Sequence, residues 1–232
     1  MAPNTPVLDL SKLSFDEFVS MFFDHDTDAE EFWYQSPDML DVETSSPSIV
    51  IEHMTRLFKK FANVVSDFSA GQINAGIWAM LGPGHFALQK YLWPPRIALS
   101  DRVDCIHSMY FVYSDYVAKS AVQLMENCFS MWWDFIASGF WEYLRWTEKI
   151  DEGDVASLNH EQRALLDSMF ETLSKILALP DARTQGYALH GLGHLHHPRV
   201  ITVVQKFLDS NRFRMSPEEI SWIEKCRDGN VM

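Results

Sequence analysis

The stretch 185–208, QGYALHGLGHLHHPRVITVVQKFL, is the part of the sequence that decides the fold. It has the pattern of two short helices joined by a tight, histidine-rich bend. Small residues on the first helix, Ala188, Gly191 and Gly193, would let a neighbouring helix approach closely. Pro198 restarts the chain after the bend, because its fixed φ and missing N–H suit the first turn of a helix. Two such helices cannot bury both apolar faces alone, so the stretch predicts further helices stacked on either side.

Helix start signals recur along the rest of the chain, where a Ser or Asn can cap the backbone N–H groups of a first turn. They occur at Ser14–Glu17, Ser46–Pro47, Ser100–Asp101, Asn159–Gln162 and Ser216–Glu219. The second signal begins a helical period of about five turns that runs to Phe68. A helix over 72–81 and a further element over 85–93 (HFALQKYLW) follow it. The pattern predicts an all-α protein of roughly nine helices with no convincing sheet.

Two stretches are less typical of surface helices. Val200 to Val204 (VITVV) has the β-branched content of a strand, but no partner strand is evident, so we expect a helix there. Residues 121–146 form the densest aromatic stretch, and the carboxylates of Asp134 and Glu142 exclude a membrane span. Because aromatics occur all round this expected helix, we predict that it is buried on most sides. Core packing is the more common role for such aromatics, and a partner-binding groove is the alternative.

A polar connector, KIDEGDVASL at residues 149–158, is the best candidate for a boundary within the chain. We expect an N-terminal helical region, 1–148, that carries an acidic loop at 25–47, and a C-terminal helical region, 159–232. Both regions are predicted to pack as one continuous domain.

The segment ALHGLGHLHHPRVITVVQKFL resembles one unit of the HEAT-like repeats of the short-helix kind, which have small residues in an ALxxLGxL core. The clear resemblance covers about residues 185–208. It implies an irregular α-solenoid, a HEAT-like α-α superhelix. Such arrays usually hold another protein along a concave face, so the resemblance implies binding more firmly than chemistry.

The cysteines and the apolar runs indicate the compartment. Cys105, Cys128 and Cys226 are odd in number, far apart and outside any CxxC spacing, which is typical of free buried thiols in a reducing compartment. No apolar run approaches the roughly 18 residues that a transmembrane helix needs. The first residues lack the charged and apolar regions of a signal peptide. We therefore expect a cytoplasmic protein.

Negative charge is concentrated at the N-terminal end. Residues 1–50 contain eleven acidic residues against Lys12 alone, so they carry 1 − 11 = −10 of the total formal charge of −13. Nucleic acids and anionic membranes need a basic surface, so both are excluded as partners. The acidic region suits a basic protein partner, and a solvated acidic surface that aids solubility is the alternative.

The candidate partner-binding residues combine carboxylates with aromatic rings in the loop after the first helix. They are Asp24, Asp26, Asp28, Glu30, Glu31, Phe32, Trp33 and Tyr34. The three rings could contact the partner or anchor the loop to the body. The aspartates imitate the start of a calcium-binding EF-hand loop, but Ala29 and Gln35 stand at its glycine and final glutamate positions, which argues against calcium.

The histidines around the bend are candidate metal ligands. His190 and His194 are four residues apart and would share one helix face, and His197 could add a third ligand. His85 or Glu161 could complete the set from elsewhere. Histidines at helix ends more often bond to backbone carbonyls, so no cofactor is expected.

No catalytic motif is present: the chain lacks a GxSxG nucleophile, a glycine-rich phosphate loop and a dinucleotide-binding fingerprint. We therefore expect a non-enzymatic protein-binding module, a scaffold or adaptor. One alternative is a small acidic inhibitor or immunity-type protein that neutralises a toxin or an enzyme. The other is a metal-binding protein or enzyme that uses the His190/His194 cluster.

Overall fold

The structure is a computed structural model that describes residues 7–27, 33, 41–84, 86–120 and 127–231. This part of the chain is mostly helical, with ten α-helices and one short pair of strands, which confirms the all-α class. The strands are β1 (Val7–Asp9) and β2 (Asp41–Glu43). The first helices are α1 (Phe15–Phe23), α2 (Pro47–Lys59), α3 (Phe61–Val64), α4 (Ala70–Leu81) and α5 (Leu99–Phe111). The later helices are α6 (Asn127–Thr147), α7 (His160–Leu177), α8 (Ala182–Leu195), α9 (Val200–Asn211) and α10 (Pro217–Arg227).

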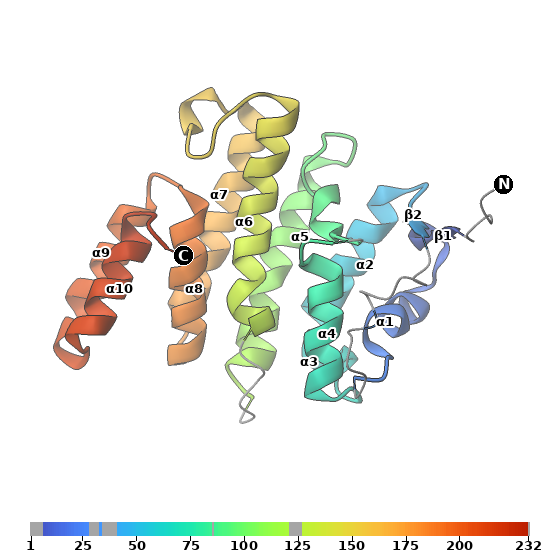
Figure 1. Ribbon diagram of the computed structural model, residues 1–232, viewed down its shortest axis with the longest axis horizontal. Helices are drawn as coiled ribbons and strands as arrows, with labels where there is room; N and C mark the ends of the chain where they lie inside the picture. The colour runs from blue at the N-terminus through green and yellow to red at the C-terminus, as the bar shows by residue number, and fades with distance from the viewer. Residues whose placement is uncertain (1–6, 28–32, 34–40, 85, 121–126, 232) are drawn as a thin grey trace.

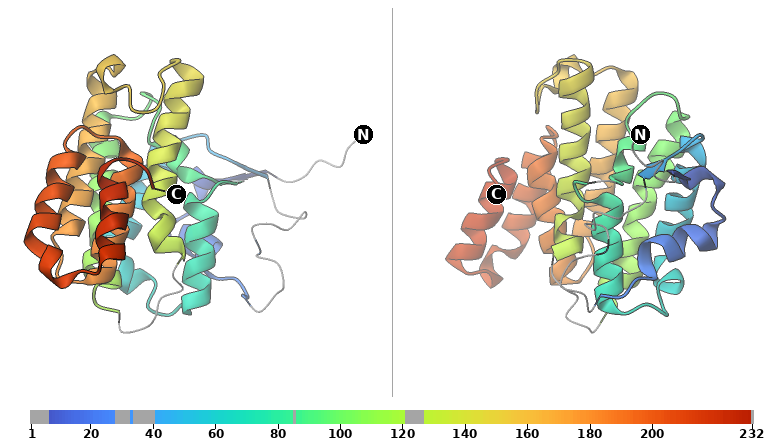
Figure 2. Two further views of the ribbon diagram at one scale, coloured as in Figure 1. Left: turned by 60° about the vertical axis from the view of Figure 1, so that its left-hand side comes forward. Right: turned by 45° about the vertical axis from the view of Figure 1, so that its right-hand side comes forward.

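The helices form two layers, and within each layer they follow one another along the long axis of the molecule (Figure 1). In one layer α2 packs against α5, and α5 packs against α7. In the other layer α1, α4, α6, α8 and α10 pack in that order. The hairpins α7–α8 and α9–α10 link the layers, and Figure 2 shows them from two further sides. The bend at 196–199 therefore joins two helical hairpins, and α8 packs more extensively on α6, α7 and α10 than on α9.

Close helix packing depends on the small residues of α8. A Cβ at Gly191 would lie 2.4 Å from the Trp133 Cβ, and one at Gly193 would lie 2.7 Å from Val231 Cγ2. Such distances are far below van der Waals contact, so only glycine allows the neighbouring segments to approach this closely. The predicted close approach at these two positions is confirmed.

The predicted helix starts were mostly correct. Capping boxes begin α1 at Ser14, α7 at Asn159 and α10 at Ser216, and VITVV lies in α9 as expected. The start of α5 was predicted wrongly: the helix begins at Leu99, and Ser100 lies inside its first turn.

Two predicted helices differ in the structure. The long helix expected from Ser46 to Phe68 ends as α2 at Lys59, and α3 begins after Lys60. The element expected over 85–93 is only a 3₁₀ turn at Leu88–Tyr91, preceded by Ala87 in the left-handed region at φ 40°. A left-handed residue interrupts an α-helix, because the next N–H no longer points along the helix axis.

The prediction of no sheet was wrong. β2, which lies in the acidic loop, pairs in parallel with β1, and Leu8 lies opposite Val42. The Asp9 carboxylate fastens the end of this pair. It accepts hydrogen bonds from the backbone and side chain of both Ser11 and Ser45. These bonds hold the pKa of Asp9 well below its usual range, with the Ser11 hydroxyl as the largest cause.

The centre of the core is built from the aromatic residues of α6, as predicted. Trp132, Trp133 and Trp141 are at most 1% exposed. The indole N–H of Trp141 donates to the Leu195 carbonyl at 3.2 Å, which satisfies one of the last carbonyls of α8. Among the described helices, none combines the length and apolar character that crossing a bilayer requires.

Candidate functional site

The acidic loop predicted to bind a partner lies only partly in the described region. Asp24 and Asp26 are exposed beside the C-terminal end of α1. Trp33 is the other candidate that the structure describes. The remaining candidates lie outside the described residues: Asp28, Glu30, Glu31, Phe32 and Tyr34.

Trp33 packs against the end of α1. Its ring stacks on the His25 ring with centroids 3.8 Å apart and an interplanar angle of 13°, and it also contacts Phe86. His25 is itself fixed, because its Nε2 donates to the Met21 carbonyl at 2.7 Å. The stack therefore holds a partly buried aromatic ring on His25, whose neighbours in the sequence, Asp24 and Asp26, are exposed.

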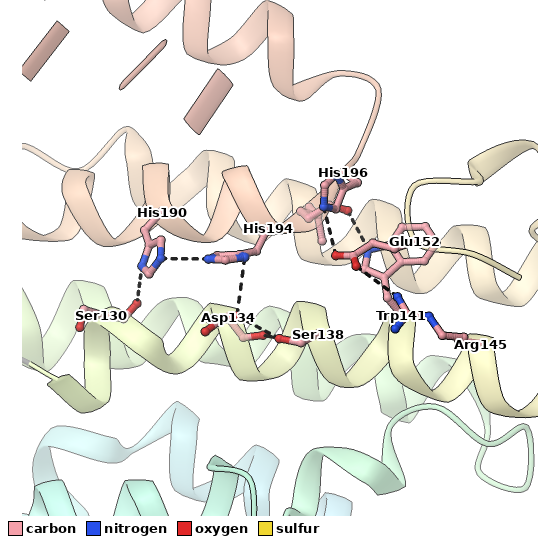
Figure 3. Close-up of polar contacts among 10 residues, drawn as sticks. Ser130, Asp134, Ser138, Trp141, Arg145, Glu152, His190, His194 and His196 are labelled. Atoms are coloured by element: carbon pink, nitrogen blue, oxygen red, sulfur yellow. Dashed lines mark hydrogen bonds and ion pairs between the residues drawn. The ribbon is translucent and has the colours of Figure 1, made fainter. Parts of the chain in front are cut away.

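Two histidines of α8 form a second candidate site, where α8 packs on α6 (Figure 3). His190 Nδ1 lies 3.2 Å from the Ser130 carbonyl, and His194 Nδ1 lies 3.6 Å from the Asp134 carboxylate. The two Nε2 atoms lie 3.0 Å apart. Ser138 donates to the Asp134 carboxylate at 2.9 Å and also to the Asp134 carbonyl. The structure therefore brings together two of the three predicted metal ligands and adds carbonyl and carboxylate partners from α6.

Partial burial changes the titration of His194. Desolvation lowers its pKa below the usual 6.5, and the nearby Asp134 carboxylate opposes that shift. The neighbouring His190 lowers the pKa further. The neutral imidazole, which is the form that binds metals, is thus favoured near pH 7.

The other two histidines of the bend have different partners. His196 caps α8 in the left-handed region, and its Nε2 lies 3.1 Å from the Glu152 carboxylate. His197 Nε2 bonds to Asp167 at 2.9 Å, and its Nδ1 accepts from the Arg199 N–H at 3.1 Å. Both ring nitrogens of His197 are therefore occupied. The ring faces α7 and does not join His190 and His194 beside α6.

The proposed extra ligands do not join the pair either. Glu161 binds the buried Arg102 guanidinium at 2.5 Å between α5 and α7, and His85 lies outside the described residues. Within the described ranges, no group of three or more His, Cys, Asp or Glu side chains is placed to hold a metal ion. From the described part of the chain, an ion held by His190 and His194 would therefore have two protein ligands.

A hollow of about 480 Å³ lies between α2 and α5. Both signs of charge line it, from Glu52, Arg56, Lys59, Lys60, Asp101 and Asp104. An exposed ion pair, Lys59–Asp104 at 2.7 Å, crosses between its walls. Mixed charges favour neither an anionic nor a cationic ligand, so this hollow indicates no function.

Sequence reasoning missed the residues of α6 that contact His190 and His194. Ser130, Asp134 and Ser138 recur every four residues in an otherwise aromatic helix, so they share one face. That polar stripe is a signal that could have identified the partner of the α8 histidines.

Comparison of the chain with family models, with curated proteins and with solved structures gave no match. Its function is therefore inferred from its own residues.

Proposed function

We propose that this protein is a non-enzymatic protein-binding module, a scaffold or adaptor, that engages a basic protein partner through the acidic, aromatic segment near its N-terminus. The observation that carries the proposal is the charge of −10 in residues 1–50 out of −13 for the whole chain. Asp24 and Asp26 are exposed, and they flank His25, which stacks on Trp33, in the sequence. Carboxylates around an aromatic ring suit a basic surface, because charges steer the encounter and aromatic rings supply contact area.

The helix arrangement supports the second part of the proposal, an irregular α-solenoid of HEAT-like build. The α7–α8 and α9–α10 hairpins stack through α8 and α10, and the two layers continue through α5 and α6 toward α2 and α4. Stacked helical hairpins present extended surfaces, and such surfaces commonly bind other proteins. In this arrangement α1 lies at one end of the array and the α9–α10 hairpin at the other (Figure 1).

Neutralising the acidic segment tests the proposal. A variant with Asp24, Asp26 and Asp28 changed to Asn, and Glu30 and Glu31 changed to Gln, should lose a partner that the unaltered protein captures. Binding should also weaken with added salt, because exposed charges are screened over about 10 Å at 0.1 M.

A matched control separates a local effect from the change in net charge. It neutralises five exposed acids elsewhere: Asp67, Glu142, Glu148, Asp151 and Glu218. The control variant should still capture the partner. If the first variant captures the partner as well, the proposal is refuted. If the partner is a basic toxin or enzyme, loss of its activity on titration would narrow the proposal to an inhibitor or immunity-type protein.

A further inference from the structure

The partners on α6 favour the tautomers of His190 and His194 in which the two Nε2 lone pairs face each other. The Ser130 carbonyl only accepts, so His190 Nδ1 carries a proton and its Nε2 presents a lone pair. The Asp134 carboxylate near His194 Nδ1 favours the same tautomer, with the lone pair of His194 on Nε2. In the other tautomer of His194, Nε2 would donate to His190 Nε2 at 3.0 Å, and a lone pair on Nδ1 would face the Asp134 carboxylate at 3.6 Å. A cation between the two Nε2 atoms removes this conflict, because both Nδ1 protons can then point toward the groups on α6.

The ring geometry indicates what kind of cation fits. With metal–nitrogen bonds of about 2.0–2.1 Å, nitrogens 3.0 Å apart subtend about 94° at a shared metal. The ring centroids lie 4.7 Å apart. They would subtend nearly the same angle at a metal about 3.2 Å from each centroid. A straight N–H···N bond would instead place the centroids about 5.3 Å apart. The two distances therefore fit a shared metal better than a straight hydrogen bond.

We propose that His190 and His194 bind one divalent first-row transition ion, of the class that accepts ligands at right angles, such as Ni²⁺ or Cu²⁺, through their Nε2 atoms. Octahedral and tetragonal ions accept ligands near 90°, whereas a tetrahedral ion would require the nitrogens to separate to about 3.3 Å. Water or a partner's side chain fills the remaining positions.

The surroundings match those of metal-binding histidines. Such histidines almost always donate their second ring N–H to a carbonyl or a carboxylate, and here Ser130 and Asp134 provide one of each. Ser138 fixes Asp134 in turn. The side chain of His194 is 22% exposed, so an ion can enter from solvent.

Calorimetric titration of the tag-free protein with NiCl₂ tests the site. We expect one ion per chain, and His190→Gln and His194→Gln should each weaken binding by about 100-fold or more. Asp134→Asn should weaken it by about tenfold, in the range of second-shell losses. His197→Gln is the matched control and should leave affinity unchanged, because both its ring nitrogens are already bonded. Unchanged affinity in both ligand variants, or an equal loss in the control, would overturn the proposal.

Electron paramagnetic resonance of the unaltered protein with one equivalent of CuCl₂ does not depend on how any variant folds. Coupling to two imidazole nitrogens is expected. A spectrum with one coupled nitrogen, or with none, would overturn the assignment.

Discussion

The substitution Gly191→Ala tests the close contact between α6 and α8. The added Cβ would lie 2.4 Å from the Trp133 Cβ and 2.9 Å from Leu173 Cδ2. The Trp133 Cβ is bonded directly to the α6 backbone, so it can move away only if the helix moves. The cost of overpacking should therefore lie near the upper end of the usual range, about 3 kcal/mol.

Helix propensity acts in the opposite direction. Replacing a helical glycine by alanine stabilises a helix by about 1 kcal/mol, which leaves a net loss of about 2 kcal/mol for Gly191→Ala. For a chain of this length the melting temperature should fall by about 4–8 °C. Thermal and urea denaturation followed by far-UV circular dichroism would measure the change.

Gly186 provides the matched control in the same helix. A Cβ there meets nothing within 4 Å, so Gly186→Ala should gain the propensity term alone. Its melting temperature should rise by about 2–4 °C. If Gly191→Ala is as stable as Gly186→Ala, α6 and α8 do not approach as closely as described.

Four other predictions concern charge and burial. Glu161→Ala should destabilise the fold by about 1–2 kcal/mol, because it leaves the 1%-exposed Arg102 guanidinium without its carboxylate, although water reaches the half-exposed site of Glu161. Asp104→Ala removes the exposed partner of Lys59 and should cost less than about 1 kcal/mol in the same denaturation assay. All three cysteines are buried thiols: Cys105, Cys128 and Cys226. Burial raises the pKa of Cys105 and of Cys226 to about 12, so a thiol reagent at mildly alkaline pH should label the native protein only as fast as it unfolds. Burial also lowers the pKa of three histidines below 6.5: His107, His194 and His197. The unfolded chain then binds protons at a higher pH than the folded chain. The free energy of unfolding should therefore fall as the pH drops from about 7.5 to 5.5. Urea midpoints that stay constant over this range would contradict the prediction.

Local signals in the sequence predicted the helix starts well. A cap involves residues only three positions apart, so Ser14, Asn159 and Ser216 could be identified without knowing the fold. The same signal at Ser69–Gln72 begins α4 and was overlooked, because the expected helix was placed from residue 72.

Features that depend on distant contacts could not be predicted. β1 and β2 are three residues each and pair across more than 30 positions, so neither strand has a pattern of its own. The surroundings of His190 and His194 show the same limit of prediction from sequence. Helical spacing placed His190 and His194 on one face, but only the packing of α8 on α6 brings Ser130 and Asp134 beside them.

The contact at Gly191 and the geometry of the histidine pair are consequences of one packing arrangement. Gly191 lies between His190 and His194 in the sequence, and its missing Cβ lets α8 lie against the backbone of α6 at Trp133. At that spacing the main-chain carbonyl of Ser130 reaches His190, and Asp134 lies one turn further along to face His194. The orientation of both rings is therefore set by the distance between the two helices, and each outer ring nitrogen is held by a group on α6. A site organised in this way needs little rearrangement when it binds an ion, because the ligand angle is already determined by the helix packing.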